Sequence, residues 1–251
     1  ELETTHPVIR ALQRSRIGKA MSRPETRQLV LPTYLGLVKQ IDDHLGRLFN
    51  ELEQLGRLDD TLVVFTSDHG EYMGDHWMGE KDWINEEVVR VPMIVVDPRS
   101  QADNTRGTTS HELVEAVDLL PTFVEALGGE NETRKQWLEG ESLIPVLHGE
   151  RGTRREFVVC EADWGFLEMA NHLGETKEPR LRRATMLRDE RFKYVLSEVG
   201  SNLLYDLDED PDEQHDRFDD SSMGSVAADL HEQLFEWFRS RHHDTTFSDE
   251  M

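Results

Sequence analysis

The stretch TLVVFTSDHGEYMGDHWMGEK, which runs from Thr61 to Lys81, decides the fold expected for this chain. Its first part, Thr61–Thr66, is apolar or β-branched without alternation. Such a run is typical of a strand that is buried on both faces, as in a parallel sheet. Asp68 and His69 follow at once. Because ligands of open α/β sheets bind beyond the carboxyl ends of strands, this pair is expected at a functional site.

The residue types in this loop indicate a metal and an oxyanion. A carboxylate and an imidazole such as Asp68 and His69 are ligands that divalent cations accept. Lys81 could place a point charge on a bound oxyanion, and His76 could donate a proton or a hydrogen bond to it. Capping and hydrogen bonding remain the alternative for Asp68 and His69. Surface solvation remains the alternative for Lys81 and His76.

Composition excludes several classes of partner. The chain of 251 residues carries 51 acidic and 28 basic residues, for a net charge of -23. This charge argues against binding to nucleic acid or to an anionic membrane, since both demand a positive surface. No apolar run approaches the length of a membrane span. The single cysteine, Cys160, permits no disulfide within the chain, and a cytoplasmic location is expected.

The first part of the chain is expected to be an α/β layer. Apolar residues spaced by three and four predict a long amphipathic helix over Pro32–Leu55, directly before the central strand. A second apolar run, Val91–Val96, predicts a neighbouring strand. Asp118 as a cap and a pair of glycines at the end predict a helix over Val117–Leu127.

The sequence pattern changes near residue 155. Closely spaced short strands with turn residues between them predict an antiparallel sheet, and a final helix is expected to cover it. The chain is therefore expected to have two domains, residues 1–150 and residues 151–251. The strands are expected at Phe157–Cys160, Arg183–Leu187, Phe192–Leu196 and Leu203–Leu207, and the helix at Val226–Phe238.

Several motifs in the correct order resemble one family. TLVVFTSDHGEYMGDH, followed by EEVVRVPMIV, is similar to the sulfatase family of the alkaline-phosphatase-like superfamily, in particular to phosphonate monoester hydrolases and bacterial arylsulfatases. YLGLVKQIDDHLGRLFNELEQLG, AVDLLPTFVEALGG, GESLIPVLHG and the C-terminal KY…LYDL run extend the resemblance. It implies part of an alkaline-phosphatase-like sheet with flanking helices, and a small C-terminal antiparallel sheet packed by a helix.

The resemblance also implies roles for site residues. Asp68 and His69 match the second pair of metal ligands, for calcium, manganese or magnesium, although many relatives have Asn in place of His69. Lys81 matches the lysine that contacts the sulfate or phosphoryl oxygens, and His76 is expected to assist catalysis.

The nucleophile that the family uses is not found in this chain. It is a formylglycine made from Cys or Ser in a C/S-x-P/A-x-R motif. Cys160 and Ser22 both lack the arginine at the fifth place. We therefore expect the C-terminal portion of such an enzyme, with the first acidic metal pair and the nucleophile in an N-terminal part, and we expect the 251 residues alone to be inactive.

The expected function is metal-dependent hydrolysis of small anionic sulfuric, phosphoric or phosphonic esters. One alternative is a metal-dependent phosphodiesterase or phosphatase of the same superfamily, which would use a Thr or Ser nucleophile. Another is a non-catalytic binding or assembly module with a relic site. Phosphonate monoester hydrolases of this type tend to form homo-oligomers, so the resemblance implies a homo-oligomer.

Overall fold

The structure is a computed structural model that describes residues 6–129, 138–150, 155–163 and 183–241. Contacts within the chain define two compact units. The α/β unit contains the described residues of Arg16–Lys81 and Glu87–Glu156. The C-terminal unit contains those of Glu1–Ser15, Asp82–Glu86 and Phe157–Met251. Each unit is made of more than one segment of the chain. The assignment of domains to residues 1–150 and 151–251 stays a prediction.

The central strand of the α/β unit has one neighbour and an unexpected direction. Strand β1 (Val63–Thr66) pairs antiparallel with β2 (Met93–Val96), and Phe65 lies opposite Ile94. All four residues of β1 are half-buried. The prediction of a parallel-type strand buried on both faces was therefore wrong for this chain. An apolar run without alternation indicates two faces to be covered, but it does not fix the direction of the partner strand.

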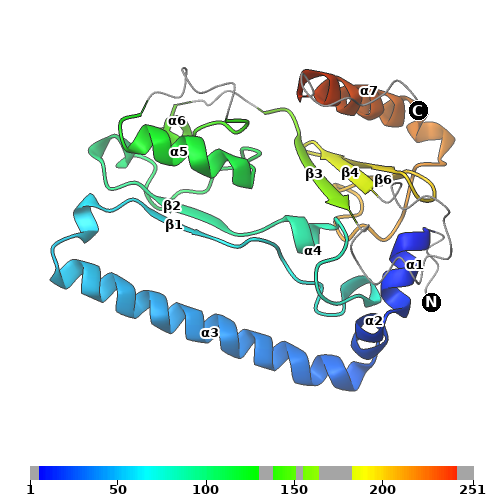
Figure 1. Cartoon of the computed structure of the whole chain (residues 1–251), viewed down its shortest axis with the longest axis horizontal. Helices are drawn as coiled ribbons and strands as arrows, with labels where there is room; N and C mark the ends of the chain where they lie inside the picture. Colours follow the sequence, from blue (N-terminus) through cyan, green and yellow to red (C-terminus); the bar gives the residue numbers. More distant parts are fainter. Residues whose placement is uncertain (1–5, 130–137, 151–154, 164–182, 242–251) are drawn as a thin grey trace. The chain divides into compact units, whose positions relative to one another are not determined.

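The long helix α3 (Pro24–Gln54) is the largest element of the same unit (Figure 1). It begins at Pro24 rather than at the predicted Pro32, because a proline at the first helical position needs no hydrogen-bond partner. None of its residues is buried. Neither α3 nor any other helix in the described ranges has the apolar composition and length of a membrane span. Its predicted apolar face is exposed at Tyr34, Val38, Ile41, Leu48 and, just beyond its end, Leu55.

Short helices and turns complete the α/β unit, and a buried carboxylate anchors one of the turns. The predicted helix over Val117–Leu127 is confirmed as turn η4 (Ala116–Asp118) followed by α5 (Leu119–Ala126). The Asp118 carboxylate is buried, accepts a hydrogen bond from the Glu115 amide at 2.7 Å, and pairs with the Arg155 guanidinium at 2.7 Å. The other elements are α2 (Arg16–Met21), α4 (Glu86–Val89), α6 (Ile144–Leu147), η1 (Leu58–Asp60), η2 (Asp75–Trp77) and η3 (Ser100–Ala102).

The C-terminal unit contains the predicted antiparallel sheet. Its four strands are ordered β3-β4-β5-β6 with each pair antiparallel, and α7 covers one face (Figure 1). Leu187, Tyr194 and Leu204 of the sheet pack against Leu230 and Leu234 of α7. Their burial stabilises the unit by the hydrophobic effect. The elements are α1 (Pro7–Arg14), β3 (Val158–Asp163), β4 (Arg183–Arg188), β5 (Phe192–Ser197), β6 (Leu203–Asp206), η7 (Ser221–Met223) and α7 (Gly224–Arg241).

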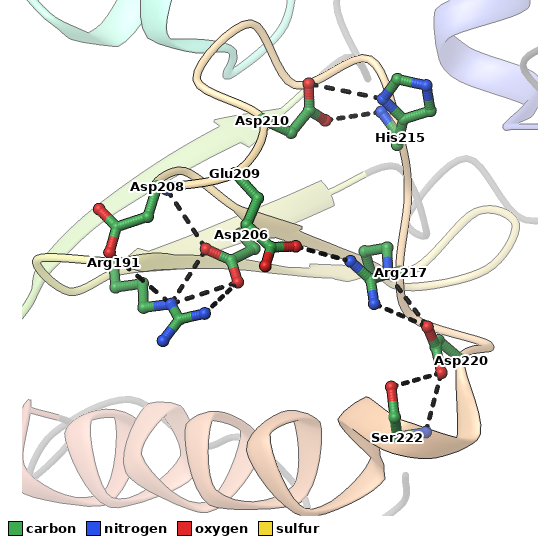
Figure 2. A network of polar contacts seen from close by, with 9 residues as sticks. All are labelled: Arg191, Asp206, Asp208, Glu209, Asp210, His215, Arg217, Asp220 and Ser222. Carbon is green, nitrogen blue, oxygen red and sulfur yellow. Dashed lines mark hydrogen bonds and ion pairs between the residues drawn. The ribbon is translucent and has the colours of Figure 1, made fainter.

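Charged side chains brace the acidic loop that follows β6 (Figure 2). The Arg191 guanidinium makes two hydrogen bonds to the buried carboxylate of Asp206, at 3.0 and 2.6 Å. At the other end of the loop, Arg217 donates to Asp220 at 2.8 Å. A planar guanidinium matches a carboxylate in this way, so both ends of the loop are held.

A buried histidine makes the C-terminal unit sensitive to mild acid. His6 is 1% exposed, its Nε2 lies 3.2 Å from the Ser197 hydroxyl, and its ring lies 4.9 Å from that of Trp83. Burial lowers the pKa of His6 from 6.5 to about 4. Between these values the unfolded chain binds a proton that the folded chain does not. The stability that the neutral His6 ring contributes is therefore complete above pH 6.5 and is lost as the pH falls toward 4.

We expect the free energy of unfolding to be about 1.4 kcal/mol lower at pH 5.5 than at pH 8 because of His6 alone. Urea denaturation of the wild type and of His6→Gln at the two pH values measures this. Carboxylates titrate in both proteins, so the difference between them isolates the histidine. Equal pH dependence in the two proteins would show that His6 is not buried as a neutral ring.

Candidate metal and anion site

Asp68 and His69 lie directly beyond the end of β1, where the sequence places them. The Asp68 side chain is 85% exposed and the His69 side chain is 34% exposed. The Asp68 Oδ1 accepts a hydrogen bond from the His69 amide at 3.1 Å. The carboxylate therefore lies back over its own turn, next to the imidazole.

Hydrogen bonding sets the tautomer of His69. Its Nδ1 lies 2.7 Å from the carbonyl oxygen of Gly70, which can only accept, so Nδ1 carries the proton. In the neutral ring Nε2 then presents its lone pair, and it lies 3.5 Å from Asp68 Oδ2. Metal-binding histidines commonly donate their second ring nitrogen to a carbonyl in this way.

The spacing of the two ligand atoms fits a cation. Two atoms that each lie about 2.0–2.5 Å from one metal ion are about 3–4 Å apart. The 3.5 Å between His69 Nε2 and Asp68 Oδ2 falls in this range. A lone pair facing a carboxylate is stabilised by a cation or a proton between them. The donor set of one carboxylate and one imidazole suits a hard or borderline divalent ion.

Local interactions keep Asp68 ionised. Burial acts to raise the pKa of Asp68, but the neighbouring His69, the backbone amides of Asp68 and His69, and the Ser67 hydroxyl together hold it below its ordinary value. A carboxylate that is charged at neutral pH is the form that binds a metal.

The segment after the pair is fixed to the backbone of α4. The Gly70 amide donates to the Val88 carbonyl at 2.7 Å, and the Glu71 amide donates to the Glu87 carbonyl at 3.0 Å. A Cβ on Gly70 would lie 1.9 Å from the Glu87 carbonyl oxygen. Only glycine permits this close approach, so Gly70 fixes where the chain leaves the metal pair.

The next loop closes on itself and returns Lys81 toward the same segment. The Tyr72 amide donates to the Glu80 carbonyl at 3.2 Å, and the Glu80 amide donates to the Glu71 carboxylate at 2.6 Å. The loop carries a concentration of unusual backbone angles. Positive φ angles occur at Met73, Gly74, His76, Trp77 and Glu80. Non-glycine residues in this region are strained, and such strain is concentrated at functional sites.

His76 is held inside this loop. Its side chain is 10% exposed, Nε2 lies 3.4 Å from Glu87 Oε1, and its ring stands edge-on to that of Tyr72. Glu87 therefore lies beside the imidazole, besides contributing the backbone carbonyl that accepts from Glu71. From the sequence alone, Glu87 has no evident role. The only available signal was its place as the second acid of a Glu-Glu pair directly after the loop.

Lys81 follows Glu80 and is exposed. Its ammonium makes no ion pair or hydrogen bond within the described ranges, so it is available to a ligand. The structure thus places Asp68 beside His69, and His76 against Glu87. The convergence of Lys81 and His76 with the metal pair on one ligand stays a prediction.

The described residues do not form a complete metal site. Over these residues, no group of three or more His, Cys, Asp or Glu side chains is arranged to hold a metal ion. Two ligands bind a cation weakly, since proteins usually supply three or more. The Asp68–His69 pair alone therefore does not make a metal site, and its role as a ligand pair stays a prediction.

Comparison with known proteins identifies the family. The sulfatase family model matches residues 5–129, and the model for the C-terminal region of N-sulphoglucosamine sulphohydrolase matches residues 74–240. The chain belongs to the sulfatase family. This confirms the family, and with it the alkaline-phosphatase-like fold, that the sequence motifs indicated.

Individual relatives agree with this assignment. The multifunctional alkaline phosphatase superfamily protein PehA of Trinickia caryophylli is 32% identical over 92% of the chain, and the N-acetylglucosamine-6-O-sulfatase of Bacteroides thetaiotaomicron is 30% identical over 87%. The crystal structure of the phosphonate monoester hydrolase of Agrobacterium radiobacter matches 90% of the chain with a TM-score of 0.78 and 31% identity. The chain covers 44%, 37% and 44% of these three proteins, less than half of each.

Proposed function

We propose that this chain provides the C-terminal half of the active site of a metal-dependent hydrolase that cleaves sulfuric, phosphoric or phosphonic esters. The observation that carries the proposal is the pairing of Asp68 with His69, whose Nε2 lone pair faces the carboxylate at 3.5 Å. The relatives support the reaction class, because they include a sulfatase and a phosphonate monoester hydrolase. The substrate is a small ester with an anionic tetrahedral group.

Each site residue has a separate task in this proposal. Asp68 and His69 would hold a divalent cation, calcium, manganese or magnesium, which would supply Lewis-acid polarisation of an ester oxygen. The Lys81 ammonium neutralises the charge that grows on the non-bridging oxygens. The His76 imidazole, oriented by Glu87, donates a proton to the departing alkoxide.

The nucleophile must come from outside the 251 residues. The C/S-x-P/A-x-R motif is missing from the sequence, and the chain covers less than half of the relatives compared above. We infer that a further segment supplies a formylglycine and the remaining metal ligands. The exposed apolar residues of α3 and β2, among them Val38, Ile41 and Ile94, are where this segment would pack. Below, the completed protein means the chain joined to the segment that supplies these groups.

A phosphatase or phosphodiesterase of the same superfamily is the second candidate. The similarity to PehA, described as a multifunctional alkaline phosphatase superfamily protein, favours it. The two candidates differ in the nucleophile, which is formylglycine in the first and Thr or Ser in the second. Mass spectrometry of the completed protein distinguishes them, since conversion of cysteine to formylglycine changes the mass of one peptide.

Turnover of p-nitrophenyl sulfate and of a p-nitrophenyl phosphonate tests the proposal. We expect the 251-residue chain alone to give no rate above background, because it lacks a nucleophile. We expect the completed protein to turn over at least one of the two substrates and to lose activity with a chelator. Turnover by the isolated chain, or an inactive completed protein that is correctly folded, would contradict the proposal.

The place of action and the assembly state remain predictions. The cytoplasmic location is checked by fractionating cells that express the native gene. The homo-oligomer is checked by light scattering of the completed protein, because the exposed apolar residues of the isolated chain would cause non-specific association.

A further inference from the structure

A buried cluster of charges lies in the C-terminal unit, on strand β5. The Lys193 side chain is 0% exposed, and its Nζ lies 2.8 Å from Glu86 Oε1 and 2.9 Å from Glu213 Oε1. It also donates to the carbonyl oxygen of Ile84 at 3.2 Å. The ammonium thus pairs with two carboxylates and donates a hydrogen bond to one carbonyl oxygen.

The cluster is balanced in charge but costly to bury. Arg188 lies 3.4 Å from Glu86, so two cations face two carboxylates. Burial raises the pKa of Glu213, although Lys193 opposes this shift. A hydrophobic group in place of such a cluster is often no less stable, so stability alone does not account for it.

The charged cluster binds a short segment of backbone. The second oxygen of Glu213 accepts a hydrogen bond from the Glu86 amide at 2.6 Å, while Lys193 binds the Ile84 carbonyl. Trp83, Ile84 and Asn85 are each 2% exposed. The segment Asp82–Glu86 is therefore fixed at its carbonyl, at its amide and by its side chains.

The loop that carries Glu213 is itself braced. Figure 2 shows its two ends tied by Arg191 to Asp206 and by Arg217 to Asp220. Glu213 has a φ of 50°, and its amide donates to the Asp210 carbonyl at 3.1 Å. A strained residue is retained where the surrounding structure over-determines it. The loop thus presents one carboxylate in one fixed position.

We propose that Lys193 and Glu213 are positioning residues for Lys81, because they fix the segment Asp82–Glu86 that begins one peptide bond after it. The inference rests on the proposed function, in which Lys81 contacts the anionic group of the substrate. Neither residue touches the substrate. Their effect on the reaction passes through the backbone that sets where the Lys81 side chain starts.

Hydrogen exchange on the isolated chain tests the first step without any need for catalysis. In Glu213→Gln, which keeps the shape but removes the charge, we expect the amides of residues 83–86 to exchange at least tenfold faster. The matched control is Glu232→Gln, which alters an exposed pair with Arg239 on α7 and should leave these amides unchanged. Unchanged exchange in Glu213→Gln, or equal acceleration in both variants, overturns the clamp.

A double-mutant cycle in the completed protein tests the second step. Glu213→Gln is expected to lower kcat per folded molecule about tenfold, and to lower it no further in the Lys81→Ala background. A purely structural role would give the same loss in both backgrounds. Lys193→Arg keeps the positive charge, so it should retain more of kcat than Glu213→Gln does. It takes the place of Glu213→Gln in the cycle if that variant fails to fold.

The two steps separate the failure of this inference from that of the proposed function. If Lys81→Ala leaves kcat unchanged, the proposed role of Lys81 is wrong, while the hydrogen-exchange result still stands for the clamp. If Lys81→Ala lowers kcat but the cycle shows equal losses in both backgrounds, the function stands and the positioning role is wrong.

Discussion

Lys81→Ala is expected to lower kcat of the completed protein about 10²- to 10³-fold, the usual loss when one group that stabilises a developing anion is removed. The ammonium is exposed and makes no ion pair with the described residues, so its removal leaves no buried partner behind. The fold should therefore be unaffected. Steady-state kinetics with the better of the two nitrophenyl substrates measures the loss.

Lys39→Ala is the matched control for Lys81. Lys39 is an exposed lysine of α3 that pairs with Asp42 and Asp43 on the same helix. Its removal takes away one positive charge without touching the site, and kcat should stay within twofold of the wild type. If Lys81→Ala were as active as Lys39→Ala, Lys81 would be a solvated surface lysine without a role in the reaction.

Lys193→Met is expected to destabilise the C-terminal unit by about 3–5 kcal/mol, because it leaves buried carboxylates without their cation. Lys193 is fully buried between Glu86 and Glu213, and of the cations in the described part of the chain only Arg188 is paired with these carboxylates. Chemical denaturation followed by circular dichroism measures the change. Lys39→Met should leave the denaturation midpoint unchanged, since that lysine is solvated.

A second substitution tests the reason for this loss. In the Lys193→Met background, Glu213→Gln removes one uncompensated charge and should recover part of the stability. In the wild type the same substitution should destabilise. Additive losses in the double variant would mean that the two side chains do not interact, contrary to their 2.9 Å separation.

Much of the fold could be predicted from local pattern. The strands of the C-terminal sheet follow from closely spaced short runs with turn residues between them, and helix α7 follows from helical spacing, all of which act over a few residues. The antiparallel pairing of β1 with β2 did not follow, because the unalternating run Thr61–Thr66 contains no information on direction. The exposure of α3 did not follow either, since an apolar face indicates only that some partner is needed.

The residues of the candidate site could also be predicted only in part. Asp68 and His69 could be located because they directly follow an apolar run, and Lys81 could be included because it lies in the same loop. Glu87 could not be linked to His76, nor Glu213 to Lys193, because these pairs form through tertiary contacts that no local pattern encodes. In the sequence Lys193 is an ordinary lysine of an expected strand, and only the structure shows that it is buried.

A crystal structure of the completed protein with Mn²⁺ and vanadate tests the central claim most directly. We expect the cation within about 2.0–2.5 Å of an Asp68 carboxylate oxygen and of His69 Nε2. We also expect the Lys81 ammonium within hydrogen-bonding distance of a vanadate oxygen. A cation bound elsewhere, or a vanadate that Lys81 does not reach, would contradict this claim.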